Sequence, residues 1–245
     1  LQKREIFSMM DGSISRSARQ MMIWGNKPIE RISLTECWAG LDFNSPAAAI
    51  LLGDFDLHRS LQEELEAIAA KTAIWFIPGN HDADRDDWYD RLFNSQLGDR
   101  NLHGRVVEIA GKRVAGLGGV FRGKIWMPPA APKFPTQKDL LSTCSRGERW
   151  RDGIPRKHHA SIFWQQYQDL LAQRADILVT HEAPSSHRYG FKALDDLAVA
   201  MGVKTIFHGH HHEHYSTTIG NGIIVHGVGE AGVVDWQGRV LIAGK

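Results

Sequence analysis

The chain of 245 residues contains only two cysteines, Cys37 and Cys144, which are too few and too far apart for a disulfide framework or a zinc knuckle. No apolar run approaches the roughly 20 residues of a membrane span, and the start of the sequence has neither an initiator Met nor the apolar core of a signal peptide. A net charge of +1 provides no field that would attract nucleic acid or a membrane. We therefore expect a protein of the reducing cytoplasm without a membrane or nucleic-acid partner, and of unknown oligomeric state.

Histidine, by contrast, is abundant: there are 13, and six of them lie between His208 and His226. The length fits one large domain, and the apolar and charged fractions are those of a globular protein. We interpret residues 1–19 as an N-terminal extension and residues 20–245 as a single domain. Within it, residues 121–157 form an insertion, because the prolines between Met127 and Pro135 prevent a helix or an inner strand.

Hydrophobic patterning predicts an α/β fold. Strands expected at 20–24, 47–52 and 73–77 alternate with helices expected at 29–41 and 60–71, which indicates a parallel sheet with right-handed crossovers. Asp84 is suited to cap a helix that reaches Leu97. The second half predicts a hairpin around Ala110 and Gly111, helices at 160–174 and 192–201, strands at 176–180 and 204–207, and four strands after residue 214.

Four of the expected strands end directly on polar residues that bind metal ions. The segments that follow them are Gly53-Asp54, Gly79-Asn80-His81-Asp82, His181, and Gly209-His210-His211-His212. Ligands of an open α/β sheet bind beyond the carboxyl ends of its strands, so these segments are expected to converge. Carboxylate, amide oxygen and imidazole together suit Mn, Fe or Zn.

These motifs resemble those of the calcineurin-like metallophosphoesterase superfamily, which run Asp-x-His, Gly-Asp, Gly-Asn-His-Asp/Glu, His and Gly-His-x-His. The last four are present here in order, and the resemblance covers roughly residues 20 to 230. It implies a sandwich of two mixed β-sheets flanked by helices, with two divalent ions between strand ends. It also implies a role for each matched residue: Asp54 bridges the ions, Asn80, His181 and His210 hold the second ion, His212 holds the first, and the unliganded His81 assists at the phosphoryl group.

The first motif of that family is degenerate. Asn26, in Gly25-Asn26-Lys27-Pro28, replaces its Asp, and Pro28 replaces its His; the alternative candidate, Asp11, also has no His two residues later. The first metal site is therefore expected to be weaker than the second. The acid that orients His81 is left open, because the position used by many relatives is Leu57 and Asp56 lies one residue earlier.

The predicted function is hydrolysis of phosphate mono- or diesters by metal-activated water, with a phosphorylated small molecule or another phosphate ester as substrate. Arg122, or an arginine between Arg146 and Arg156, is a candidate for contacting the phosphate, although a solvated loop is the favoured interpretation of the arginine run. One alternative is a phosphoesterase-like binding or regulatory protein with an impaired first metal site. Another is a different metallohydrolase reaction, such as amide or lactone cleavage.

Overall fold

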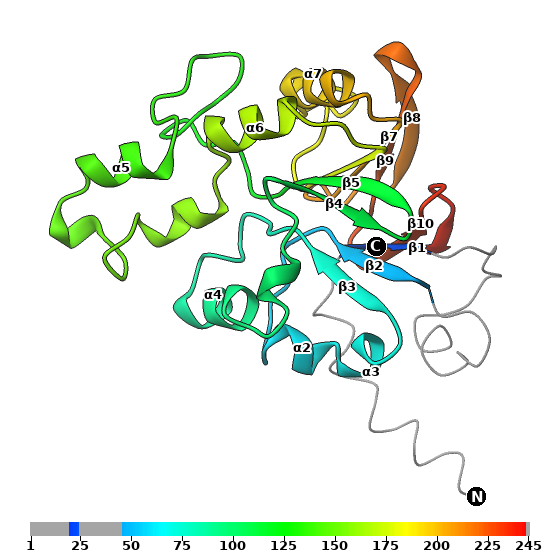
Figure 1. Cartoon of the computed structure of the whole chain (residues 1–245), viewed down its shortest axis with the longest axis horizontal. Helices are drawn as coiled ribbons and strands as arrows, with labels where there is room; N and C mark the ends of the chain where they lie inside the picture. Colours follow the sequence, from blue (N-terminus) through cyan, green and yellow to red (C-terminus); the bar gives the residue numbers. More distant parts are fainter. Residues whose placement is uncertain (1–19, 25–45, 244–245) are drawn as a thin grey trace, which may run out of the picture.

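The computed structural model describes residues 20–24 and 46–243, the first of these segments by its backbone alone (Figure 1). The helix expected at 29–41 and the two candidates for the first motif, Asn26 and Asp11, lie outside the described residues.

The described strands form two mixed sheets. The first has the order β11-β10-β1-β2-β3, and the second has the order β4-β5-β6-β7-β9-β8. In chain order the strands are β1 (Gln20–Trp24), β2 (Ala48–Leu51), β3 (Ala73–Phe76), β4 (Arg105–Ile109), β5 (Lys112–Leu117), β6 (Ile177–Thr180), β7 (Thr205–His208), β8 (Tyr215–Ile219), β9 (Ile223–Gly227), β10 (Gly232–Asp235) and β11 (Val240–Ile242).

Helices cover the sheets, in agreement with the expected α/β sandwich (Figure 1). The α-helices are α2 (Leu61–Glu64), α3 (Glu66–Ala69), α4 (Asp86–Phe93), α5 (Gln137–Thr143), α6 (Trp164–Leu171) and α7 (Lys192–Met201); the 3-10 helices are η1 (Gly98–Arg100), η2 (Arg146–Glu148), η3 (Arg156–Ala160) and η4 (Gly220–Gly222). The single helix expected at 60–71 is divided at Leu65. Helix α4 begins later than expected, with Arg85 at its N-cap, so the prediction that Asp84 caps it is wrong.

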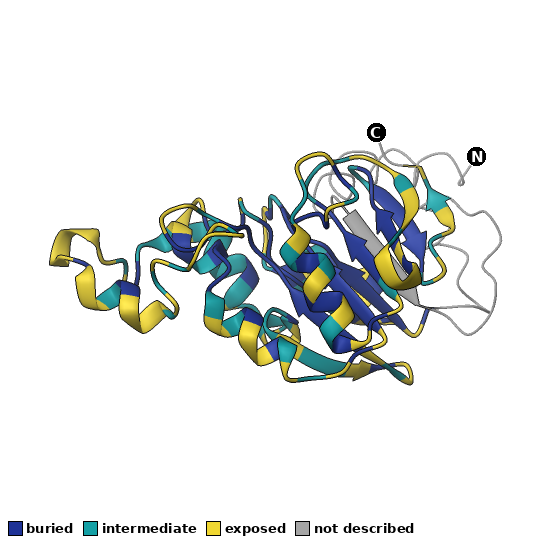
Figure 2. Cartoon of the chain, turned by 90° about the horizontal axis from the view of Figure 1, so that it is seen from above, coloured by how far each residue is buried: buried dark blue, intermediate teal, exposed yellow. Residues whose placement is uncertain are grey.

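The two faces of β2 show why its sequence is an unbroken apolar run. Ala49 and Leu51 pack in one core cluster with residues of α2, α3 and α4, whereas Ala48 and Ile50 pack in another cluster with Val179 and Phe207 of the second sheet. A strand that is buried on both faces has no polar alternation. A third cluster joins the second sheet to α6, α7 and the insertion, so the core has an inner layer between the sheets and two outer layers beneath helices. Figure 2 shows the buried strands between exposed helix faces.

The direction of β1 differs from the sequence expectation. Strands β2 and β3 are parallel as predicted, but β1 runs antiparallel to β2, with Trp24 opposite Ala48 and Met21 opposite Leu51. It is parallel to β10. The hydrophobic pattern of a buried strand is the same in both directions. The pattern therefore could not distinguish a crossover connection to a parallel β2 from a connection to an antiparallel β2. As a consequence, β1 ends at the edge of the sheet opposite to the one where β2 ends.

The insertion is more ordered than its prolines suggested. Its inner part packs on α6 through aromatic contacts, because the ring centroid of Trp126 lies 4.8 Å from that of Trp164 in α6 and 5.0 Å from that of Phe121 within the insertion. Its outer part contains α5 and extends from one end of the molecule, where most of its surface is exposed (Figure 2). Among the helices of the described segments, none is both long and apolar enough to cross a membrane.

Candidate metal centre

Asp54 is presented by a tight turn that follows β2. Gly53 and Asp54 both have positive φ, at 95° and 59°, and the side chain of Asp54 is buried against Gly79. A Cβ on Gly79 would lie 2.2 Å from Asp54 Oδ1, so glycine is required at that position. The Gly-Asp and Gly-Asn-His-Asp segments therefore fit together as one unit.

His181 faces this turn in a fixed orientation. Its Nδ1 donates to the carbonyl of Leu52 at 2.7 Å, which directs Nε2 at Asp54 Oδ2, 3.4 Å away, and at Asn80 Oδ1, 3.1 Å away. Two ligand atoms that bind one ion at about 2.1 Å are roughly 3.0–3.5 Å apart, so these separations suit a shared cation. A carbonyl that orients a ligating imidazole in this way is typical of metal sites.

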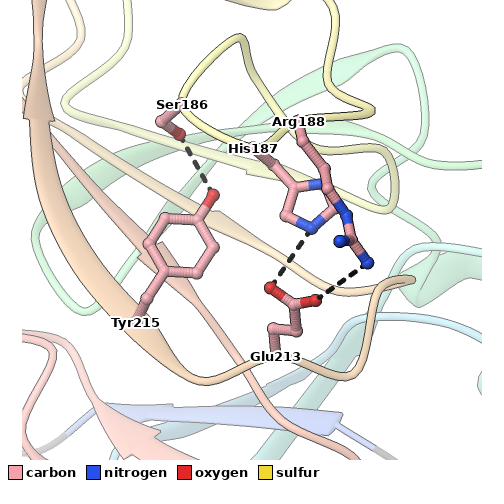
Figure 3. Close-up of a pocket in the computed structure, with 5 residues that line it drawn as sticks. All are labelled: Ser186, His187, Arg188, Glu213 and Tyr215. Carbon is pink, nitrogen blue, oxygen red and sulfur yellow. Dashed lines mark hydrogen bonds and ion pairs between the residues drawn. The ribbon is translucent and has the colours of Figure 1, made fainter.

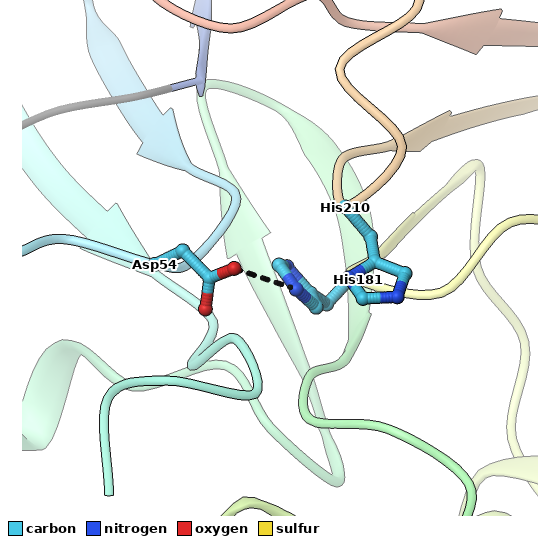
Figure 4. A group of neighbouring side chains, drawn as sticks. All are labelled: Asp54, His181 and His210. Carbon is cyan, nitrogen blue, oxygen red and sulfur yellow. Dashed lines mark ion pairs between the residues drawn. The ribbon is translucent and has the colours of Figure 1, made fainter. Parts of the chain in front are cut away.

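His210 completes the group. Asp54, His181 and His210 each offer one ligand atom, and these atoms lie within 4.8 Å of one another (Figure 4). Burial, together with the charge of His181, lowers the pKa of His210 to about 4, so its imidazole stays neutral and able to bind a metal. Burial opposes ionisation of Asp54, but the charge and hydrogen bond of His181 hold its pKa below the usual range. The donor set fits Mn, Fe or Zn.

Glu182 adds a second candidate group that the sequence reasoning missed. Glu182, His210 and His211 offer ligand atoms within 4.8 Å of one another, and Glu182 also accepts a hydrogen bond from the Phe121 amide at 3.1 Å. Burial raises the pKa of Glu182 to about 7. The only sequence signal for this residue was its position directly after His181.

His212, the ligand expected for the first ion, belongs to neither group among the described residues. Its Nδ1 lies 3.7 Å from Oε2 of Glu230, in the connection between β9 and β10. Asn26, the other residue predicted for that ion, lies outside the described residues. The strand before it ends beside Ala48, at the edge of the sheet opposite to Asp54.

Asp82 holds the turns together. Its carboxylate accepts hydrogen bonds from the backbone amides of Asp54 at 2.9 Å, Phe55 at 2.8 Å and Gly79 at 2.7 Å. Burial and the charge of Asp54 raise the pKa of Asp82 to about 6. The motif match included this residue, but no sequence pattern indicated that its partners would be backbone amides of another segment.

The acid that orients His81 is Asp84. His81 Nδ1 lies 2.6 Å from Asp84 Oδ2, and the backbone amide of His81 donates to Asp54 Oδ1 at 2.9 Å. Leu57, which occupies the position used by many relatives, is buried in the core. The pair His81–Asp84 thus lies beside the ligand cluster, with both side chains about half exposed.

Three arginines of the insertion bond to residues outside it. Arg122 donates to the carbonyl of Asn80 at 3.3 Å, which places its guanidinium beside the ligand cluster. Arg151 forms two bonds to Asp90 of α4, at 2.6 and 2.8 Å. Arg156 donates to the carbonyls of Ala83 and Asp84 and pairs with Asp86. The last two arginines therefore fasten the insertion to the His81 loop and α4.

A polar hollow of about 240 Å³ borders the histidine cluster and is lined by Ser186, His187, Arg188, Glu213 and Tyr215 (Figure 3). The His187 ring stacks on His211, with 3.9 Å between ring centroids. Glu213 bridges His187 and Arg188, at 3.4 and 3.9 Å. The hollow is therefore connected to the ligand cluster through His211.

The two-sheet fold and the ligand cluster at its strand ends give the chain the architecture of a metal-dependent phosphoesterase. It matches the calcineurin-like phosphoesterase family over residues 31–214. An uncharacterized protein of Haemophilus influenzae is 44% identical over 195 residues, which cover 80% of this chain and 85% of that protein. The chain belongs to the calcineurin-like phosphoesterase family.

Solved structures with related folds are more distant. A Thermus thermophilus protein is 16% identical with a TM-score of 0.45, over 69% of this chain and 68% of that one. The 5'-nucleotidase of Candida albicans is 14% identical with a TM-score of 0.44, over 76% of this chain. This chain spans only 39% of that nucleotidase.

Proposed function

We propose that the protein hydrolyses phosphate mono- or diesters with the help of two divalent ions, Mn, Fe or Zn. The observation that carries the proposal is the convergence of Asp54, Asn80, His181 and His210 beside the oriented pair His81–Asp84. When bound, such ions acidify a water molecule and neutralise the phosphate oxygens.

The residues of the chain have separate tasks in this scheme. Asp54, Asn80, His181 and His210 bind the second ion. Asp84 accepts a hydrogen bond from the Nδ1–H group of His81 and so directs Nε2 away from itself, where Nε2 of the protonated ring can donate a proton to the leaving oxygen. Arg122 contacts the phosphate through guanidinium nitrogens that its bond to Asn80 leaves available.

Hydrolysis of generic aryl phosphates tests the proposal. We expect the purified chain to hydrolyse an aryl phosphate monoester or diester in added Mn²⁺, and chelation to abolish the activity. Failure to cleave either ester in added Mn, Fe or Zn would refute it.

Acyl esters, an amide and a lactone in the same assay test the alternative metallohydrolase reactions. One tightly held ion without turnover would instead identify the binding protein, an alternative favoured by the position of His212 outside the ligand cluster.

His81→Ala tests the acid role separately from metal binding. We expect kcat to fall about 100-fold or more, within the 10²–10⁴ range of general acid catalysis, while the metal content stays at the wild-type value because His81 is not a ligand. Asp84→Asn is expected to reduce kcat less, since it leaves the imidazole in place. Wild-type turnover in the His81→Ala variant would exclude the assigned role.

A further inference from the structure

The connection between β9 and β10 crosses from the second sheet to the first at the edge where the metal ligands gather. β7 and β9 are parallel, with His208 opposite Gly227, and the amide of Val228 donates to the carbonyl of His208 at 3.0 Å. The loop that carries His212 and the loop that carries Glu230 therefore leave the second sheet side by side.

The register of the first sheet places Glu230 relative to Asp54. Met21 of β1 lies between Val233 of β10 and Leu51 of β2, so these three residues form one row across the sheet. β10 and β2 run in opposite directions, and Glu230 precedes Val233 by as many residues as Asp54 follows Leu51. Both acids therefore leave the sheet at the same edge, about two strand spacings apart, roughly 10 Å between backbones.

The spacing between His212 and Glu230 is close to that of two ligands of one ion. Their facing atoms, Nδ1 and Oε2, are 3.7 Å apart, which is long for a hydrogen bond. It exceeds by only a few tenths of an ångström the roughly 3.0–3.5 Å between two atoms that bind one cation. The two side chains are also 38% and 35% exposed, so an ion can reach them from solvent.

His212 is close in sequence to the ligand cluster. It lies two residues after His210, which belongs to the group formed with Asp54 and His181. An ion held by His212 and Glu230 would thus lie at the same edge of the sheets as that group.

We propose that Glu230, together with His212, binds the first ion of the pair and supplies a carboxylate where Asn26 of the degenerate first motif offers only an amide. The assignment rests on the proposed metal-dependent function. It adds a ligand from the β9–β10 connection, which is outside the four motifs that the sequence reveals. A carboxylate oxygen and an imidazole nitrogen suit Mn, Fe and Zn alike.

Metal stoichiometry tests the assignment without any turnover measurement. The full chain, stripped with a chelator, is titrated with Mn²⁺ while the free Mn²⁺ is counted by electron paramagnetic resonance. We expect two equivalents in the wild type, and in Glu230→Gln an unchanged tighter equivalent with the weaker one reduced in affinity about tenfold to hundredfold. Glu213→Gln is the matched control, since Glu213 contacts a histidine and an arginine at the adjacent hollow, and it should keep both equivalents.

Two results would overturn the assignment: a wild type that binds only one equivalent, or a Glu230→Gln variant that binds the second with wild-type affinity. Thermal unfolding of the stripped variants checks that both fold, which is expected because Glu230 is on the surface. Suppose that the wild type binds two equivalents of Mn²⁺, that Glu230→Gln binds one, and that the wild type hydrolyses no phosphate ester. This result would support the assignment of Glu230 and refute the proposed reaction. The two hypotheses thus fail separately.

Discussion

Asp82 shows how one buried carboxylate can determine the shape of a site that it does not enter. Three backbone amides from two turns converge on it, and two of them belong to the residues Asp54 and Gly79 that pack against each other. Without these bonds the amides would be buried and unpaired, a cost of about 1–3 kcal/mol for each group. The position of Asp54 therefore depends on a residue that follows a different strand.

Asp82→Asn is expected to destabilise the metal-free chain by about 1–3 kcal/mol and to weaken Mn²⁺ binding, because an amide side chain turns its NH₂ group toward at least one of the three donors. Urea denaturation and Mn²⁺ titration measure the two effects. The exposed Asp99, replaced by Asn, provides the control and should change neither. A stable variant with wild-type metal affinity would show that the three bonds are dispensable.

At the scale of the elements, an arginine of the insertion bonds to the loop that carries His81. Arg156, at the start of η3, donates to the carbonyls of Ala83 and Asp84, so it holds the backbone of the residue that orients His81. Arg151 makes a comparable bond to Asp90 in the middle of α4, away from that loop. The insertion thus supports the His81 loop from outside.

This arrangement predicts a difference between two otherwise similar variants. Arg156→Ala and Arg151→Ala each remove an exposed or partly exposed ion pair, so each should lower stability only slightly. Only Arg156→Ala should also reduce kcat, by about threefold to tenfold, because a small displacement of a catalytic group is costly. Equal kcat values for the two variants would refute a supporting role for the insertion.

For the whole molecule, buried neutral histidines predict acid sensitivity. Burial lowers the pKa of His103 and His158 to about 4 and of His208 to about 3, and that of His210 and His211 to about 4. These neutral histidines do not oppose folding above pH 6.5. As the pH falls from 6.5 toward 4, the same histidines bind protons in the unfolded chain but not in the folded one, so the free energy of unfolding decreases. Asp82, Glu182 and His181 act oppositely, because their raised pKa values favour folding at lower pH. They are three groups against seven, since burial also lowers the pKa of His159 and His226.

We therefore expect the urea midpoint of the chelator-treated chain to be lower at pH 5 than at pH 7.5. The measurement is made at constant ionic strength, so that a change in screening does not contribute. A urea midpoint at pH 5 equal to or above the one at pH 7.5 would show that the buried histidines do not dominate the pH dependence of stability.

The sequence predicted those parts of the fold and site that depend on local pattern. The strands that precede Asp54, Asn80, His181 and His210 were expected within a residue or two, because buried apolar runs and the motifs that end them are local features. The direction of β1 was not predicted correctly, since it depends on pairing with β10 at the far end of the chain. Asp84 and Glu230 were missed as partners of histidines because their roles arise from loop conformation rather than from spacing.

The hydrogen bond between His181 and the carbonyl of Leu52 joins residues 129 positions apart in the chain. His181 is still unsynthesised when Leu52 leaves the ribosome, and closing so long a loop delays the contact during folding. A ribosome-bound chain that has released only β2 and β3 therefore presents Asp54 and Asn80 without the imidazoles of His181 and His210. Both sheets also need the C-terminal strands to be complete, so we expect this ligand group to assemble only once nearly the whole chain has been synthesised.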